Sequence, residues 1–136
     1  MSESEKNKEL LRQYTQEALI EGKLDAVAKY ISPQYVHHAP PGPDIRGIEG
    51  MRSAVVAYRK AFSDLRIEIH DMVGEKDRVA TRLTIHGTHS GEYAGIKATG
   101  KKIKLAVIAI DRFADCKVME GWEFADVAGL RAQLTS

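Results

Sequence analysis

The last quarter of the chain carries a carboxylate in a position suited to acid/base chemistry. Glu123 lies near the end of a short run that ends at Ala125, and a tight turn around Asp115 and Cys116 precedes the run. A carboxyl group at the end of a strand, facing an apolar pocket, loses hydration of its charged form, and its pKa rises. A carboxylate with a raised pKa is suited to removing a proton next to a carbonyl and returning it elsewhere.

The alternation of side chains along this strand leaves the orientation of Glu123 open. Alternate residues of a strand point to opposite faces. The alternation therefore groups Val118, Glu120, Trp122 and Phe124 on one face and Met119, Gly121 and Glu123 on the other. Periodicity alone would turn the large apolar face inward and leave Glu123 in water.

The histidines do not have the spacing of a metal site. His37 and His38 are adjacent in an extended segment, so their side chains should diverge, and only one of them can enter a given pocket. His86 and His89 differ in strand parity in the same way, and no pair has the i, i+4 helical spacing of a zinc site. We therefore expect no metal.

Helical and strand periodicities follow one another along the chain. Apolar residues recur at helical spacing over residues 3–21, 24–31 and 48–62. Strand patterns then cover residues 65–70, 78–89, 102–113 and 118–124, and Asp126 is placed to cap a short closing helix. Helices first and strands afterwards predict an α+β fold, in which N-terminal helices pack on an antiparallel sheet. With no repeat and no linker, residues 1–136 are expected to form a single domain.

Composition excludes several classes of partner. Twenty basic and 19 acidic residues give a formal net charge of +1, which provides no electrostatic footprint for nucleic acid or an anionic membrane. No apolar run approaches the length of a membrane span. A single cysteine and a charged N-terminal segment favour a cytoplasmic location.

The longest strand is apolar on both faces. Residues 105–110 read Leu-Ala-Val-Ile-Ala-Ile, so one face can meet the helices while the other also needs cover. No helix remains to provide that cover. We therefore predict a homodimer packed through the outer sheet face.

Several segments together resemble the SnoaL-like polyketide cyclase and ester cyclase family, within the nuclear-transport-factor-2-like superfamily. The resemblance rests on His37-His38-Ala39-Pro40-Pro41-Gly42, Phe62-Ser63-Asp64-Leu65, residues 87–96 with Thr99-Gly100-Lys101, and Glu120-x-Trp122 with Asp126-x-x-Gly129-Leu130. It implies a strongly curved sheet and helices that form a cone around a pocket. It also implies a cofactor-independent enzyme that closes a ring by intramolecular aldol condensation, with its catalytic acid falling on Glu123 and a polar loop residue on His37.

One departure from the family pattern concerns the strand opposite the acid. The cyclases place polar side chains there, at positions that match Val107 and Ala109 of this chain. An apolar wall favours a small apolar or aromatic ligand. The residues expected to line the pocket are Tyr14, Val55, Tyr58, Leu83, Ile85, Leu105, Val107, Ala109 and Met119.

Two functions are compatible with these features. The first is acid/base proton transfer on a small apolar carbonyl compound, leading to aldol ring closure or isomerisation. The second is a non-catalytic dimeric module that binds a small molecule in the same fold. The loss of polar residues at Val107 and Ala109 supports the second.

Overall fold

The computed structural model describes residues 1–136 and contains five helical segments and six strands. The helical segments are α1 (Glu3–Tyr14), the π-helix η1 (Thr15–Ile20), α2 (Asp25–Tyr30), α3 (Gly47–Ala61) and α4 (Val127–Thr135). The strands are β1 (Ile31–His38), β2 (Ile45–Arg46), β3 (Arg66–Glu75), β4 (Arg78–Thr88), β5 (Lys102–Ala114) and β6 (Lys117–Ala125). No helix combines the length and apolar character needed to cross a lipid bilayer.

The strands form one mixed sheet in the order β2-β1-β6-β5-β4-β3. The paired strands that follow one another along the chain are antiparallel, whereas β1 and β6 run parallel. The α+β class predicted from the sequence is confirmed, with this one parallel pair added to the expected antiparallel sheet. A hairpin turn dictates an antiparallel pair, but β1 and β6 are separated by most of the chain, so no turn determines their direction.

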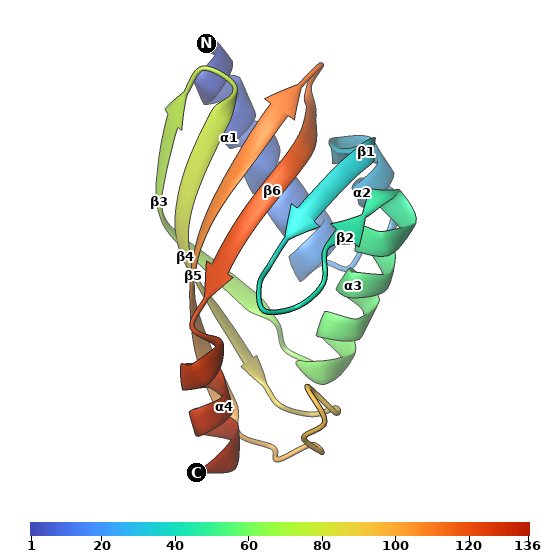
Figure 1. Cartoon of the computed structure of the whole chain (residues 1–136), viewed down its shortest axis with the longest axis vertical. Coiled ribbons are helices and arrows are strands. Elements are labelled where there is room, and N and C mark those ends of the chain that lie inside the picture. The colour runs from blue at the N-terminus through green and yellow to red at the C-terminus, as the bar shows by residue number, and fades with distance from the viewer.

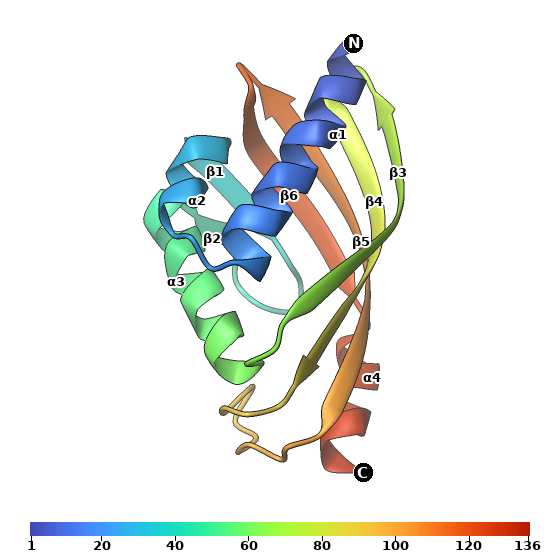
Figure 2. The same ribbon diagram turned by 180° about the vertical axis from the view of Figure 1, so that it is seen from behind.

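The helices α1, α2 and α3 lie on one face of the curved sheet, and the opposite face carries no helix over its centre (Figures 1 and 2). The closing helix α4 extends beyond one end of the sheet. Its start was correctly predicted, because the Asp126 side chain accepts a hydrogen bond of 2.9 Å from the Gly129 backbone N–H. Gln133 fixes α4 to β5 through hydrogen bonds to both the N–H and the C=O of Lys104.

A bulge near the start of β6 changes the predicted face of one residue. Phe113 pairs with Val118 and Arg112 pairs with Glu120, so Met119 is the extra residue on β6. The bulge turns Val118 inward, where it is 1% exposed, while Trp122 and Phe124 stay on the outer face. The prediction that Val118 shares a face with Trp122 is therefore wrong, and Gly121 and Glu123 are the inward-facing residues that follow.

The apolar interior is divided into two clusters. The first contains Tyr14, Val55 and other residues of the N-terminal helices with β1, and the second contains Ile85 and residues of α4 and β5. Residues of both clusters line one cavity between the helices and the inner sheet face. A fully packed core would leave no such volume. The fold therefore provides the hollow that a ligand site needs.

Candidate active site

The cavity has a volume of about 280 Å³ and is lined mainly by apolar side chains from α1, α3 and the inner face of the sheet. Seven of the sequence-predicted site residues lie in its wall: Tyr14, His37, Val55, Tyr58, Leu83, Ile85 and Glu123. Its few polar groups converge on an apolar space, as in ligand sites generally.

The other four predicted pocket residues lie outside this wall. Leu105 and Val107 are buried in the second core cluster, together with Leu130 and Leu134 of α4. Ala109 and Met119 are half-buried but do not line the cavity. Leu105 and Val107 therefore pack with α4, and Met119 lies in the bulge on β6. The cavity wall is made more by β4 than by the middle of β5.

Glu123 lies on the inner face of β6, directly opposite Ala109 of β5. Its side chain retains 33% of its accessible surface, and the carboxylate belongs to the cavity wall. Burial raises the pKa of the Glu123 carboxyl above its ordinary value, because the charged form is deprived of water. Ala109, its cross-strand partner, carries only a methyl group.

His37 is the polar side chain that faces Glu123. Its Nε2 atom lies 3.9 Å from Oε1 of Glu123, too far for a hydrogen bond and close enough for both groups to contact one ligand. Burial lowers the pKa of His37, and the neighbouring His38 lowers it further, so the ring is neutral at pH 7.

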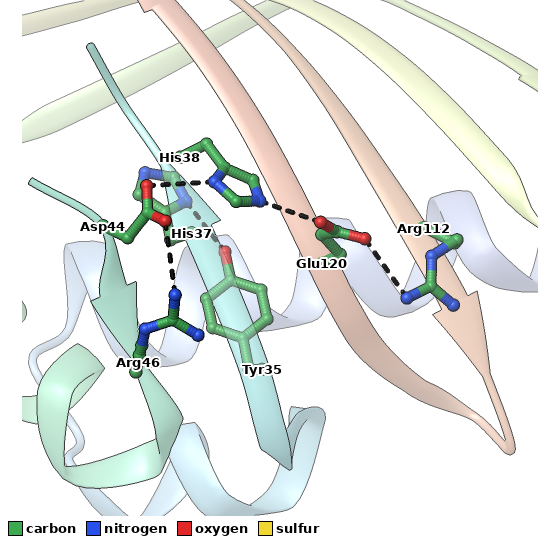
Figure 3. A network of polar contacts seen from close by, with 7 residues as sticks. All are labelled: Tyr35, His37, His38, Asp44, Arg46, Arg112 and Glu120. Atoms are coloured by element: carbon green, nitrogen blue, oxygen red, sulfur yellow. Dashed lines mark hydrogen bonds and ion pairs between the residues drawn. The ribbon is translucent and has the colours of Figure 1, made fainter. Parts of the chain in front are cut away.

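The contact with the Tyr35 hydroxyl bears on which ring nitrogen of the neutral His37 is protonated. Tyr35 and His37 stack, and the Tyr35 hydroxyl lies 2.8 Å from Nδ1 of His37 (Figure 3). We assign the proton to Nε2, because an N–H rather than a lone pair then faces the Glu123 carboxylate. In this tautomer Tyr35 donates to Nδ1, and His37 presents an N–H donor to the cavity.

Asp111 is a second carboxyl group in the cavity wall, and sequence analysis missed it. It lies on β5 opposite Gly121, on the same inner face as Ala109 and Glu123. Burial, and then the negative charge of Glu123, raise the pKa of Asp111 to about 7. The sequence does contain a signal for Asp111, because strand alternation places it on the same face as Val107 and Ala109. A carboxylate on the core face of a strand is rarely incidental.

Gly121 allows three polar groups to meet on the inner face of the sheet. A Cβ atom at this position would lie 2.8 Å from the Tyr35 hydroxyl, 2.9 Å from Oδ1 of Asp111 and 3.2 Å from Nδ1 of His37. Any side chain here would push these groups apart. Because Gly121 has no side chain, Asp111 can lie next to the Tyr35–His37 pair.

Three hydroxyl groups in the cavity wall have no hydrogen-bond partner. They belong to Tyr14, Tyr58 and Thr81, and each is shielded from bulk water. A buried hydroxyl without a partner costs free energy that a bound ligand can recover. The cavity is therefore suited to a ligand that brings several oxygen atoms to an otherwise apolar space.

The neighbouring histidine, His38, lies on the outer face of the sheet and stabilises the segment at the edge of the cavity. Its Nδ1 atom lies 3.0 Å from Asp44 and its Nε2 atom 2.8 Å from Glu120, which also contacts Arg112 at 3.3 Å (Figure 3). The two hydrogen bonds to carboxylates raise the pKa of His38. The histidine pair diverges as predicted, and the outer member fixes the segment between β1 and β2, whose ends border the cavity.

The structure offers no obvious ligand set for a metal ion. No group of three or more His, Cys, Asp and Glu side chains has a geometry that could hold one.

Comparison with known proteins connects this site to a family. Aklanonic acid methyl ester cyclase DauD of Streptomyces sp. (strain C5) is 32% identical over 127 residues, which cover 87% of this chain and 75% of DauD. Aklanonic acid methyl ester cyclase AcmA of Streptomyces galilaeus is 33% identical over 123 residues, covering 87% of this chain and 83% of AcmA.

Solved structures agree on the fold. A SnoaL-like protein from Jannaschia sp. CCS1 superposes with a TM-score of 0.92 at 18% identity, covering 100% of this chain and 96% of that one. Residues 9–134 match the family described as SnoaL-like polyketide cyclase. Nearly the whole chain thus matches one family in sequence and fold, and the protein belongs to the SnoaL-like polyketide cyclase family.

Proposed function

We propose that this protein closes a carbon ring by an intramolecular aldol reaction, with Glu123 as the general base and acid. The observation that carries the proposal is the Glu123 carboxylate in the wall of a mainly apolar cavity, with Nε2 of His37 3.9 Å away. Burial raises the pKa of this carboxyl, which brings its basicity closer to that needed at neutral pH.

The reaction needs one proton to be moved and returned. The Glu123 carboxylate takes a proton from a carbon next to a carbonyl, and the electron pair of the C–H bond forms an enolate. The enolate carbon then attacks a second carbonyl of the same molecule, and a carbon–carbon bond closes the ring. The alkoxide that results takes the proton back from Glu123, while the N–H of His37 donates a hydrogen bond to the oxygen that carries negative charge.

The chemistry of the cavity supports a substrate with an apolar body and several oxygen atoms. Its apolar walls fit a small carbon skeleton, and the free hydroxyls of Tyr14, Tyr58 and Thr81 fit carbonyl or hydroxyl oxygens. The related Streptomyces proteins are cyclases named for aklanonic acid methyl ester. We therefore infer a polyketide-type ester or a related polycarbonyl compound as the substrate class.

Two probes test this function. Aklanonic acid methyl ester should be converted to an isomer of unchanged mass, because ring closure neither adds nor removes atoms, and chromatography with mass detection would follow it. The small ketone 2-tetralone should exchange its α-hydrogens for deuterium in D₂O faster with the protein than without it, as measured by proton NMR. If both compounds bind but neither reacts, the protein is the non-catalytic binding module instead.

We also propose that two copies associate through the outer face of the sheet. Ile108, Ile110 and Phe124 are 52%, 41% and 64% exposed on neighbouring strands β5 and β6, and no helix covers them. Apolar side chains grouped in this way favour burial against a partner. A second copy fits because a twofold axis brings the same patch onto itself.

The substitution Ile110→Lys is expected to convert the dimer to a monomer, because it places a charge within the apolar contact. Sedimentation should give twice the 15.1 kDa chain mass for the unchanged protein and the single chain mass for the variant. Val56→Lys is the matched control, since Val56 is 48% exposed on α3, away from the outer sheet face. A single chain mass for the unchanged protein at micromolar concentration would contradict this assembly.

A further inference from the structure

We infer that Asp111, in its protonated form, is the hydrogen-bond donor that stabilises the enolate oxygen while Glu123 removes the proton. This inference rests on the proposed function and adds a second catalytic carboxyl group to the site. It gives the two acids different roles, with Glu123 as the base and Asp111 as the hydrogen-bond donor.

The sheet register brings the two carboxyl groups to the same part of the cavity. Asp111 of β5 pairs with Gly121, and Glu123 of β6 pairs with Ala109, so the two side chains are diagonal neighbours on the inner face. Both belong to the cavity wall. Because Gly121 and Ala109 occupy the other two positions of this square, little side-chain volume lies between the acids and a ligand.

No cation neutralises Asp111. The groups that face it are the hydroxyls of Tyr14 and Tyr35, the His37 ring beside Gly121, and the Glu123 carboxyl. Arg59 also lines the cavity, but its guanidinium donates to the backbone carbonyls of Leu19 and Ile20. A carboxyl group buried without a cation to offset the charge of its ionised form keeps its proton to higher pH.

The order in which the two protons leave assigns the roles. The pKa of Glu123 is raised by burial alone, whereas the pKa of Asp111 is raised by burial and by the charge on Glu123. Glu123 therefore ionises first, and its negative charge holds the second proton on Asp111. At pH values between the pKa of Glu123 and the pKa of Asp111, the pair consists of one carboxylate base and one neutral carboxylic acid.

A neutral carboxylic acid in an apolar site is a strong donor to a developing oxyanion. This arrangement is known from ketosteroid isomerase, where a protonated aspartic acid and a tyrosine together form the oxyanion hole. In the present site the Tyr14 hydroxyl is buried, has no partner and feels the charge of Asp111. As the C–H bond breaks and its proton moves to Glu123, the carbonyl oxygen gains negative charge and accepts hydrogen bonds from Asp111 and Tyr14, both of which keep their protons.

The pH dependence of 2-tetralone exchange tests this role. In the unchanged protein kcat/KM should fall tenfold for each pH unit above the pKa of Asp111, about 7, because the donor is lost. Asp111→Asn keeps an N–H donor that does not titrate, so this alkaline fall should disappear. Asp111→Ala removes the donor, so its kcat/KM should lie about a hundredfold below that of the unchanged protein at pH values below 7 and should show no alkaline fall of its own.

The controls separate this inference from the proposed function. Asp71→Asn, at an exposed position on β3, should keep the profile of the unchanged protein. An alkaline fall that persists in Asp111→Asn, or full activity in folded Asp111→Ala, would overturn the role of Asp111 and leave the role of Glu123 intact. An unchanged protein that exchanges no α-hydrogens at any pH would overturn both.

Discussion

Replacing Glu123 by glutamine is expected to slow ring closure of aklanonic acid methyl ester about 10³-fold or more, because the amide cannot accept the proton. The fold should be retained, since glutamine has the same shape and the Glu123 side chain forms no hydrogen bond, its approach to His37 being 3.9 Å. Ligand binding should change little. Initial rates, with the dissociation constant from fluorescence titration, would separate the lost chemistry from lost binding.

A matched variant guards against a general effect of charge removal. Glu75→Gln changes an exposed glutamate at the end of β3, far along the sheet from the cavity, and should keep the rate of the unchanged protein. Turnover of Glu123→Gln within tenfold of the unchanged protein would remove Glu123 as the base. Loss of binding together with loss of turnover would point to a structural role.

Replacing Asp111 by asparagine should stabilise the protein above neutral pH by about 4 kcal/mol. The native pKa of Asp111, about 7, exceeds the value of 3.8 that describes the unfolded chain. Between these values the native state binds more protons than the unfolded state, so the unchanged protein loses stability as pH rises. The loss is complete above about pH 7. Asparagine imitates the neutral acid and avoids it.

Urea denaturation at pH 4 and pH 8 would measure this effect. The free energy of unfolding of Asp111→Asn should match that of the unchanged protein at pH 4 and exceed it at pH 8. Asp71→Asn should show no such gain. A variant that is equally stable or less stable at pH 8 would mean that Asp111 is ionised at little cost, and its proposed role as a neutral donor would fail.

The elements of this fold could be predicted largely from local sequence signals. Helical periodicity predicted α3, and alternation with short turns predicted the antiparallel series from β3 to β6. Two features depend on long-range geometry and could not be predicted in this way. The parallel pairing of β1 with β6 joins distant segments, and the extra residue Met119 creates a bulge that reverses the parity before it.

Only part of the site could be predicted. The family resemblance and the strand periodicity gave opposite orientations for the Glu123 side chain. Periodicity favoured water for this residue, whereas the family pattern favoured the pocket, and the structure has its side chain in the cavity wall. Asp111 was not predicted, because the positions of this strand that match polar residues of the family are Val107 and Ala109. The hollow itself follows from packing between two core clusters, which no local pattern encodes.

Carbon-13 NMR titration of the side-chain carboxyls, assigned with Glu123→Gln and Asp111→Asn, tests most directly whether the cavity contains one base and one acid. Glu123 should titrate above the 4.5 of an ordinary glutamate, Asp111 near 7, and both resonances should move when 2-tetralone is added. In Glu123→Gln the pKa of Asp111 should fall, because the neighbouring charge is gone. A Glu123 carboxyl that titrates at or below 4.5 and does not respond to the ketone would contradict the account.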